Sequence, residues 1–299
     1  MPDAASGFAQ NLRGAGLMAL SMAAFTINDA AIKVIMTQVP FYQTIFLRGV
    51  FTTLGIVLLA YLLGQRSLGL ARQDRMRIFL RAGADVGATL FFLTALRQMP
   101  LANVTAILQT APLTITLAGA VFLGDPVGWR RWLAILVGFA GVMMIVQPGT
   151  EGFSFFSLYA LIAVCFVTLR DYVTRGLSED TSSMTVAGIN ALAVTLCAGI
   201  GSMGEVWQPV TGANLRYLAI SITAIIGAYY FSVATMRVGE LSFVSPFRYT
   251  SLVWALVLGY FTFGDFPGPL TLFGAFTVVA MGIYTIYREG QLARAPASD

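Results

Sequence analysis

Residues 102–123 read ANVTAILQTAPLTITLAGAVFL, a run of 22 residues without a charged side chain. A helix needs about 20 apolar residues to cross the roughly 30 Å hydrocarbon core of a bilayer. The apolar residues are continuous rather than alternating, which favours a helix over a strand of a membrane barrel. The run follows Met99-Pro100 and stops at Gly124-Asp125-Pro126, as expected for a bounded helix. It therefore predicts a transmembrane helix.

Nine further blocks of this kind lie on either side of it. Short polar or Pro/Gly-rich segments separate them, and the longest, Gly64–Arg77, is too short for a soluble domain. The ten predicted spans are 14–36, 41–63, 78–97, 102–123, 130–147, 154–175, 184–203, 215–237, 241–263 and 269–287. The fold class expected from this pattern is an all-α integral membrane protein with ten transmembrane helices.

The composition agrees with lipid as the main solvent. Of the 299 residues, 57% are hydrophobic and only 11% are charged, and the mean hydropathy is +0.78. Soluble proteins carry about 25% charged residues, so this chain has too little charge to cover a soluble surface. A cytosolic enzyme, a disordered scaffold and a nucleic-acid-binding module are excluded. The net charge of +4 comes from arginines between apolar blocks and does not indicate nucleic acid as a partner.

The residue types needed for enzymatic chemistry are scarce. The chain has no histidine, the commonest metal ligand and general base. Cys165 and Cys197 lie inside apolar runs without metal-ligand spacing, and no phosphate-binding loop, nucleophile elbow or HExxH motif occurs. We therefore predict no catalytic residues, no metal and no cofactor, and we do not expect an enzyme.

Arginine placement predicts the orientation of the spans, because basic residues accumulate on the cytoplasmic side. With a cytoplasmic N-terminus, twelve arginines fall inside and only Arg97 and Arg216 outside. The twelve are Arg13, Arg66, Arg72, Arg75, Arg77, Arg81, Arg130, Arg131, Arg175, Arg237, Arg288 and Arg294. We expect an inner-membrane protein with both termini in the cytoplasm. A signal peptide is a poor alternative for the first block, which is too long and contains Asn28, Asp29 and Lys33.

The chain also resembles itself. A shift of 140 positions aligns residues 84–128 with residues 224–268, and a shift of 142 aligns Asp29-x-x-x-Lys33 with Asp171-x-x-x-Arg175. The identities at 140 are Ala84/Ala224, Gly87/Gly227, Ala88/Ala228, Phe91/Phe231, Arg97/Arg237, Leu101/Leu241, Val104/Val244, Thr110/Thr250, Gly119/Gly259, Gly124/Gly264, Asp125/Asp265 and Gly128/Gly268. Five spans per half is an odd number, so the second half must enter the membrane from the opposite side. Two inverted five-helix repeats, 14–147 and 154–287, are predicted.

The motifs and the duplication together resemble the EamA-type family of the drug/metabolite transporter superfamily. The similar segments are Asn28-Asp29 with Lys33, Phe46-Leu47-Arg48-Gly49, and the Gly-Asp pairs that precede the last span of each half. Such proteins usually have Gly-Glu where this chain has Gly-Asp twice. The resemblance implies a transporter of small organic solutes, with the first four spans of each half around a central cavity and the fifth as outer support.

Ionisable residues inside spans are costly and mark candidate functional sites. One cluster, near the outer end, contains Asp29, Lys33 and Arg48; its repeat counterpart, near the inner end, contains Arg170, Asp171, Arg175 and Asn190. One interpretation makes them two alternating gates, the outer closed by Asp29 and Arg48. The alternative is that they anchor helix ends by reaching toward the interface.

Asp85 is the candidate proton carrier, because a buried carboxylate can bind and release a proton near neutral pH. Gly83 and Gly87 form a GxxxG motif, which predicts close helix contact on their face and places Asp85 on the opposite face. A pair with Arg81, one turn earlier, is the alternative role.

The candidate substrate residues lie on or near the fourth and ninth spans. An arginine with amide and aromatic groups suits a zwitterion or carboxylate with an apolar body. These residues are Gln109, Tyr229, Tyr230, Arg248, Tyr249 and Trp254. Tyrosine and tryptophan in spans also often only pack or mark the interface.

The function expected from these features is secondary transport of a small polar metabolite, most plausibly amino-acid-like, by alternating access. The alternative is a carrier of a nucleoside-containing cation such as S-adenosylmethionine. A membrane-embedded enzyme and a channel are more distant alternatives. The expected partners are the substrate, the lipid bilayer and a proton as coupling ion, and the chain is expected to be a monomer or a homodimer.

Overall fold

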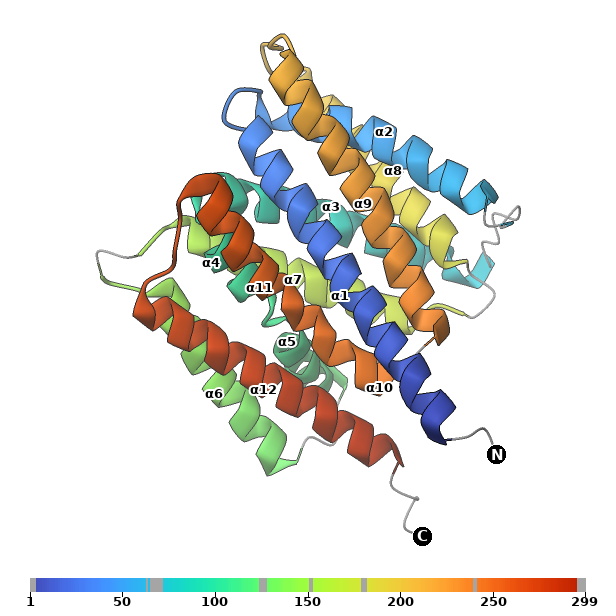
Figure 1. Ribbon diagram of the computed structural model, residues 1–299, viewed down its shortest axis with the longest axis vertical. Helices are drawn as coiled ribbons and strands as arrows, with labels where there is room; N and C mark the ends of the chain where they lie inside the picture. The colour runs from blue at the N-terminus through green and yellow to red at the C-terminus, as the bar shows by residue number, and fades with distance from the viewer. Residues whose placement is uncertain are drawn as a thin grey trace. The chain divides into compact units, whose positions relative to one another are not determined.

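The computed structural model describes residues 4–62, 64, 72–123, 128–150, 153–178, 182–238 and 241–294. Throughout these ranges, every regular element is helical (Figure 1). The predicted turn at Gly124-Asp125-Pro126 and residues 63 and 65–71 of the long connection lie outside the described residues.

Nine helices in the described part of the chain are long and apolar enough to cross a membrane. They also expose large apolar side chains, among them Leu58 (57%), Phe79 (78%) and Phe276 (70%). Exposed apolar surface on this scale indicates a lipid environment. The chain is a multi-pass membrane protein.

Residues 241–263 depart from the prediction of an unbroken span. They form four short elements: α10 (Leu241–Val244), the 3₁₀ helix η3 (Ser245–Tyr249), α11 (Thr250–Leu258) and the π-helix η4 (Gly259–Phe263). Pro246 lies at the start of η3, and proline cannot donate a backbone hydrogen bond within a helix. The apolar composition indicated a span, but local backbone chemistry interrupts it.

The chain divides into two compact units, each drawing on both predicted repeats. Unit 1 comprises Met1–Thr26, Met99–Ser157 and Gly227–Asp299, and unit 2 comprises Ile27–Gln98 and Leu158–Ile226. The helices α1 (Ala4–Ile35) and α9 (Gly212–Val238) contribute to both. The compact units therefore do not coincide with the sequence halves.

Unit 2 is built on α2 (Phe41–Leu62) and α8 (Ser183–Ser202), which cross closely and run antiparallel (Figure 1). Small residues allow the approach: a Cβ at Gly49 would lie 2.4 Å from the hydroxyl oxygen of Thr195. Thr53 and Thr195 share a 3.3 Å hydrogen bond at the same crossing. Unit 2 also contains η1 (Arg72–Asp74), α3 (Arg75–Gln98) and most of α7 (Phe156–Arg175).

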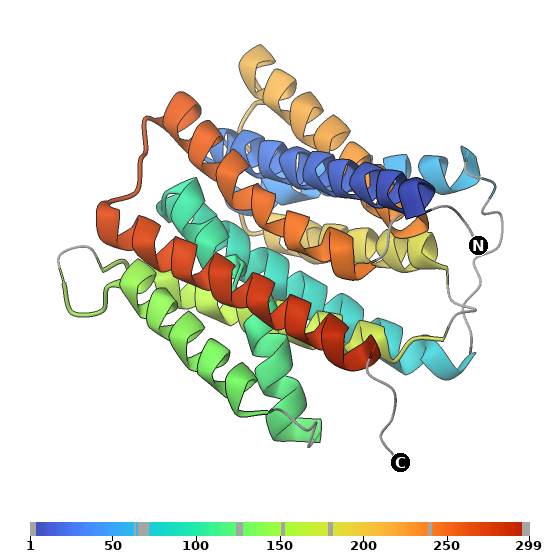
Figure 2. The ribbon, with the colours of Figure 1, turned by 60° about the horizontal axis from the view of Figure 1, so that its bottom comes forward.

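Unit 1 has a similar crossing between α6 (Trp129–Val146) and α12 (Pro269–Arg294). The two helices lie side by side in both views (Figures 1 and 2). A Cβ at Gly141 would lie 2.9 Å from the carbonyl oxygen of Gly274, and one at Gly274 would lie 2.6 Å from that of Gly141. Two glycines therefore permit backbone contact here.

The fourth span is interrupted at the same repeat position as residues 241–263. It consists of α4 (Leu101–Leu108), α5 (Ala111–Ala118) and the π-helix η2 (Gly119–Leu123). The threonine at each break bonds backward: Thr110 Oγ1 donates to the carbonyl of Ile107 at 2.7 Å, and Thr250 Oγ1 to that of Phe247 at 2.6 Å. The donor threonines, the acceptor carbonyl groups and the two π-helices all recur 140 positions apart.

Candidate functional site

One polar cluster in unit 2 joins α1, α2 and α9. It consists of Asn28, Asp29, Arg48 and Ser221, and we call it the asparagine cluster. Asn28 is only 2% exposed and lies at its centre. Its Nδ2 donates to Asp29 Oδ1 at 2.9 Å, while its Oδ1 accepts from Ser221 Oγ at 2.7 Å and from Arg48 Nη1 at 3.4 Å.

The two charged members of the predicted outer gate, Asp29 and Arg48, both bond to Asn28. Their closing of a gate stays a prediction. Asn28 bonds to Ser221 of α9, and its amide can donate and accept at once. The cluster thus holds opposite charges near each other through a neutral link.

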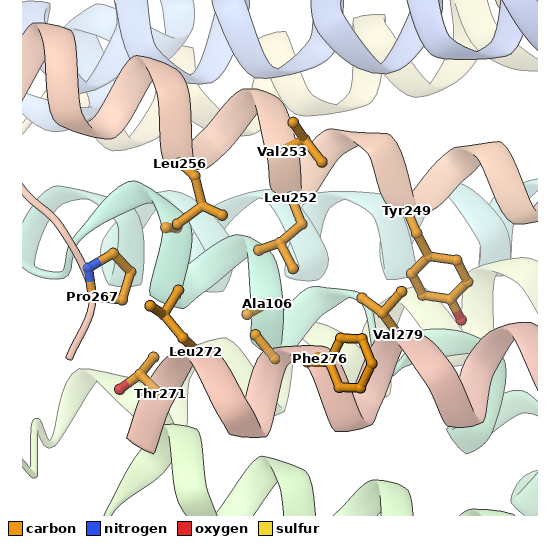
Figure 3. Close-up of a pocket in the computed structure, with 12 residues that line it drawn as sticks. Ala106, Tyr249, Leu252, Val253, Leu256, Pro267, Thr271, Leu272, Phe276 and Val279 are labelled. Carbon is orange, nitrogen blue, oxygen red and sulfur yellow. The ribbon is translucent and has the colours of Figure 1, made fainter. Parts of the chain in front are cut away.

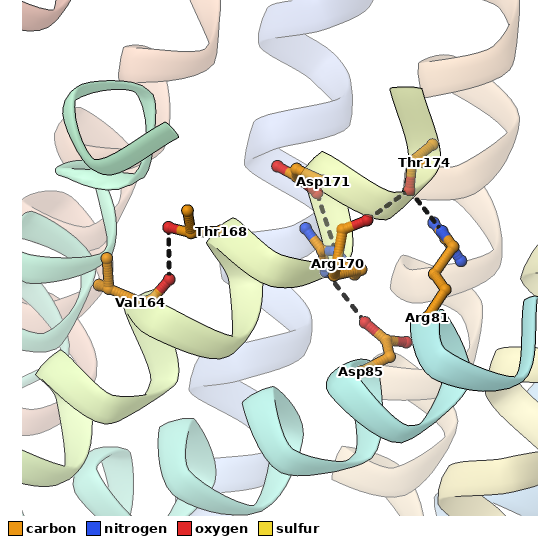
Figure 4. Close-up of polar contacts among 7 residues, drawn as sticks. All are labelled: Arg81, Asp85, Val164, Thr168, Arg170, Asp171 and Thr174. Atoms are coloured by element: carbon orange, nitrogen blue, oxygen red, sulfur yellow. Dashed lines mark hydrogen bonds and ion pairs between the residues drawn. The ribbon is translucent and has the colours of Figure 1, made fainter. Parts of the chain in front are cut away.

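A second cluster in unit 2 joins α3 to α7. It consists of Asp85, Arg170 and Asp171, and we call it the arginine cluster (Figure 4). Arg170 Nη1 donates to Asp85 Oδ1 at 3.0 Å, and its Nε donates to Asp171 Oδ1 at 2.9 Å. The three side chains are 15% to 26% exposed. Two carboxylates on one guanidinium leave a formal charge of −1.

Asp85 thus has a different partner from the predicted Arg81. Arg81 Nε instead donates to Thr174 Oγ1 at 2.7 Å, and that hydroxyl donates to the carbonyl of Arg170 at 2.6 Å (Figure 4). The helix α7 lies close enough to supply Arg170, which sequence spacing alone does not reveal.

The expected GxxxG contact is also only half right. A Cβ at Gly87 would lie 2.7 Å from the Phe166 ring, but Gly83 is exposed with nothing within 4 Å. The two glycines therefore do not define one contact face of α3, and the placement of Asp85 on the opposite face stays a prediction.

Asn190 and Arg175 complete the predicted inner cluster. Asn190 is 4% exposed, and its Oδ1 has no hydrogen-bond partner in the described part of the chain. No hydrogen bond there joins it to Arg170 or Asp171. The side chain of Arg175 lies outside the described residues. Of the predicted inner group, the structure brings together Arg170 and Asp171 and adds Asp85.

The predicted substrate residues lie in unit 1. Gln109 Nε2 donates to the carbonyl of Arg248 at 3.1 Å, so it joins the break in the fourth span to η3. Tyr229 packs edge-on against Phe25, with ring centroids 5.6 Å apart. Tyr230 and Trp254 are partly exposed, at 44% and 38%.

Unit 1 also holds a cavity of about 230 Å³ between α4, α11 and α12 (Figure 3). Its lining is apolar, with residues such as Ala106, Leu252 and Phe276, and only Tyr249 of the six predicted substrate residues contributes. Tyr249 is 5% exposed, packs against Gly282, and its hydroxyl has no hydrogen-bond partner among described residues. This lining suits an apolar group, not the charged part of a zwitterion.

Several polar contacts at helix ends were missed from the sequence. At the end of unit 2 formed by the α2 N-terminus, Glu205 accepts from the backbone N–H groups of Tyr42 and Gln43 at 3.1 and 2.9 Å. Gln43 and Gln208 exchange two further bonds of 2.8 and 2.9 Å. Carboxylates at helix N-termini are favourable, but nothing in the sequence pairs Glu205 with a helix 160 residues away.

Comparison with known proteins connects this architecture to a family. Residues 12–147 match the EamA-like transporter family. These residues make up a little under half of the chain, and over them the chain is similar to the EamA-like transporter family. This is a family of transporters and not of enzymes.

Relatives that align with most of this chain carry different substrate names. An S-adenosylmethionine uptake transporter of Rickettsia felis is 25% identical over 93% of this chain and 94% of its own. A riboflavin transporter of Vibrio cholerae is 28% identical over 77% of this chain and 78% of its own. A pseudopaline exporter of Pseudomonas aeruginosa is 24% identical over 89% and 93%. A crystal structure that is 18% identical superimposes with a TM-score of 0.64 over 94% of this chain and 98% of its own, which shows a shared fold.

Proposed function

We propose that this chain is a secondary transporter of a zwitterionic metabolite with an α-amino-acid group. The observation that carries the proposal is the asparagine cluster, which holds Asp29 and Arg48 inside two apolar spans and links them through Asn28. A substrate carboxylate on Arg48 and a substrate ammonium on Asp29 would replace contacts to a neutral amide by ion pairs, in which both partners are charged. Ionisable groups within spans are costly to retain, which favours a functional role.

Alternating access between the two membrane faces is part of the proposal. It is supported by the antiparallel crossings α2–α8 and α6–α12 and by the helix irregularities that recur 140 positions apart. Inverted repeats can exchange conformations and thereby expose one site to each face in turn. From the arginine distribution we place both termini in the cytoplasm.

The second candidate substrate is S-adenosylmethionine. It is supported by the Rickettsia felis transporter, which aligns with 93% of this chain. The molecule contains an α-amino-acid group and an additional positive charge on sulfur. The two carboxylates of the arginine cluster, Asp85 and Asp171, suit a cationic substrate or a coupling proton.

Unit 1 supplies a further candidate region for the substrate. Interrupted spans often mark binding sites in transporters, because their backbone groups are available to a ligand. Gln109 and Arg248 lie at the two interruptions and contact each other. We therefore keep these residues as substrate candidates, whereas Tyr249 belongs to the apolar cavity.

Counterflow in proteoliposomes tests the proposal. Proteoliposomes that contain the purified protein are loaded with unlabelled methionine, S-adenosylmethionine or riboflavin. Entry of the same compound in labelled form is then followed. We expect counterflow with at least one of the first two compounds and a loss of at least tenfold in Arg48→Gln. Arg97→Gln is the matched control, since Arg97 is an exposed arginine at the end of α3. Counterflow with riboflavin alone, or equal effects of the two substitutions, would refute the zwitterion proposal. Flux without counterflow would indicate a channel.

A further inference from the structure

Two hydrogen-bonded contacts close opposite ends of unit 2. At the first end, Asn214 Nδ2 donates to Gln38 Oε1 at 3.1 Å and joins α9 to the C-terminal end of α1. At the second end, Asp74 Oδ2 accepts from the backbone N–H of Ser178 at 3.0 Å and from its hydroxyl at 2.5 Å. This contact joins the segment preceding α3 to the segment following α7.

Chain direction places the two contacts at opposite ends. The N-terminus of α2 follows Gln38 directly, whereas Asp74 precedes α3 and follows the C-terminus of α2. The length of α2 therefore separates them. One residue of each contact is well buried: Asp74, the acceptor at the second end, is 0% exposed, and Asn214, the donor at the first end, is 2% exposed.

The two contacts occupy equivalent positions in the repeat. Gln38 and Ser178 are 140 positions apart, and so are Asp74 and Asn214. The same two repeat positions thus pair at each end, although the donor and the acceptor are exchanged. Both residues of the contact differ between the two repeat positions. The duplication by itself does not require the changed residues to pair again. Retained pairing with new chemistry points to a shared role.

We propose that Gln38–Asn214 and Asp74–Ser178 are paired closing contacts that position the two ends of unit 2 for transport. When Gln38–Asn214 opens, α1 and α9 separate at one membrane face; when Asp74–Ser178 opens, the helices α3 and α7 separate at the other. The inference rests on the alternating access proposed above and assigns residues outside the asparagine and arginine clusters. A weakened contact favours the state open at its own end, because it destabilises only the closed form.

Thiol labelling tests this assignment without any substrate. In a chain with Cys165→Ser and Cys197→Ser, the reporter Leu218→Cys replaces a buried residue (6% exposed) one helical turn beyond Asn214 on α9. A membrane-impermeant maleimide is added to right-side-out and to inside-out vesicles. Asn214→Ala should raise the rate of labelling about fivefold when the maleimide is added at the membrane face where Gln38 and Asn214 lie. One net hydrogen bond changes an equilibrium by about this factor. Asp74→Ala should lower that rate several-fold, and the milder Ser178→Ala should lower it less.

The control is Thr37→Val, which removes a hydroxyl bond to Val34 within α1, beside Gln38. It should leave labelling unchanged. Opposite changes for Asn214→Ala and Ser178→Ala would support the inference, because general loosening raises labelling in both. Increases in both, or no change in either, would overturn it. If counterflow occurs but none of the substitutions changes labelling, the closing contacts are wrong and the proposed function stands. If labelling changes in opposite directions but no counterflow occurs, only the proposed substrate is wrong.

Discussion

The asparagine and arginine clusters of unit 2 occupy related positions but differ in chemistry. Asp29 corresponds to Asp171 under the shift of 142, and Asn28 corresponds to Arg170. In the first cluster a neutral amide links an acid to a base; in the second, a guanidinium bonds two carboxylates directly. A similar backbone thus carries an uncharged centre at one place and a charged centre at the other. The difference teaches that helices related by a shift in sequence can carry different polar chemistry.

The largest expected effect comes from removing the charged centre. Arg170→Gln leaves Asp85 and Asp171 close together without their cation, and like charges repel. We expect loss of transport and a fall in the free energy of unfolding of about 2 kcal/mol, below the value for fully buried pairs because these side chains are partly exposed. Thermal unfolding in detergent measures the change. Adding Asp85→Asn should recover part of the stability, and no recovery would contradict the proposed repulsion.

Asp29→Asn tests the neutral-centred cluster. Asparagine keeps the size of the side chain but removes the charge proposed to bind an ammonium group. We expect uptake of the zwitterion to fall about tenfold, equivalent to about 1.4 kcal/mol, with little change in thermal stability. Uptake by proteoliposomes at several substrate concentrations gives KM and the maximal rate. An unchanged KM and rate in a folded variant would reduce Asp29 to an anchoring role.

Asp171→Asn makes the corresponding change in the other cluster. Asp85 still neutralises Arg170 in this variant, so we expect normal membrane insertion and an alteration of transport of a few-fold. Insertion is checked by membrane fractionation, and transport by uptake kinetics. If this substitution impairs uptake more than Asp29→Asn does, the roles assigned to the two clusters are reversed.

Ser221→Ala should have the smallest effect. It removes one hydrogen bond to Asn28, while Arg48 still donates to the same oxygen. We expect a loss of about 1 kcal/mol in the free energy of unfolding. Thr94→Val, which removes a bond to Leu90 within α3, is the control. If Thr94→Val lowers the free energy of unfolding as much, the bond between α9 and α1 stabilises the protein no more than a bond within one helix.

The sequence by itself determined the solvent, the number of apolar blocks and the resemblance to EamA-type transporters. Long uncharged runs can be stable only as helices in lipid, because each helix satisfies its own backbone hydrogen bonds. The sequence did not predict the interruptions at Thr110 and Thr250, although the offset of 140 aligned these two threonines.

Only the tertiary structure decided which polar side chains meet. Asp85 pairs with Arg170, and Asn28 bonds to both Asp29 and Arg48. These contacts join helices that are far apart in sequence, and each depends on the distance and rotation at which two helices cross. Helical spacing fixes the neighbours one turn away within a helix, whereas packing between helices selects the partners in the site.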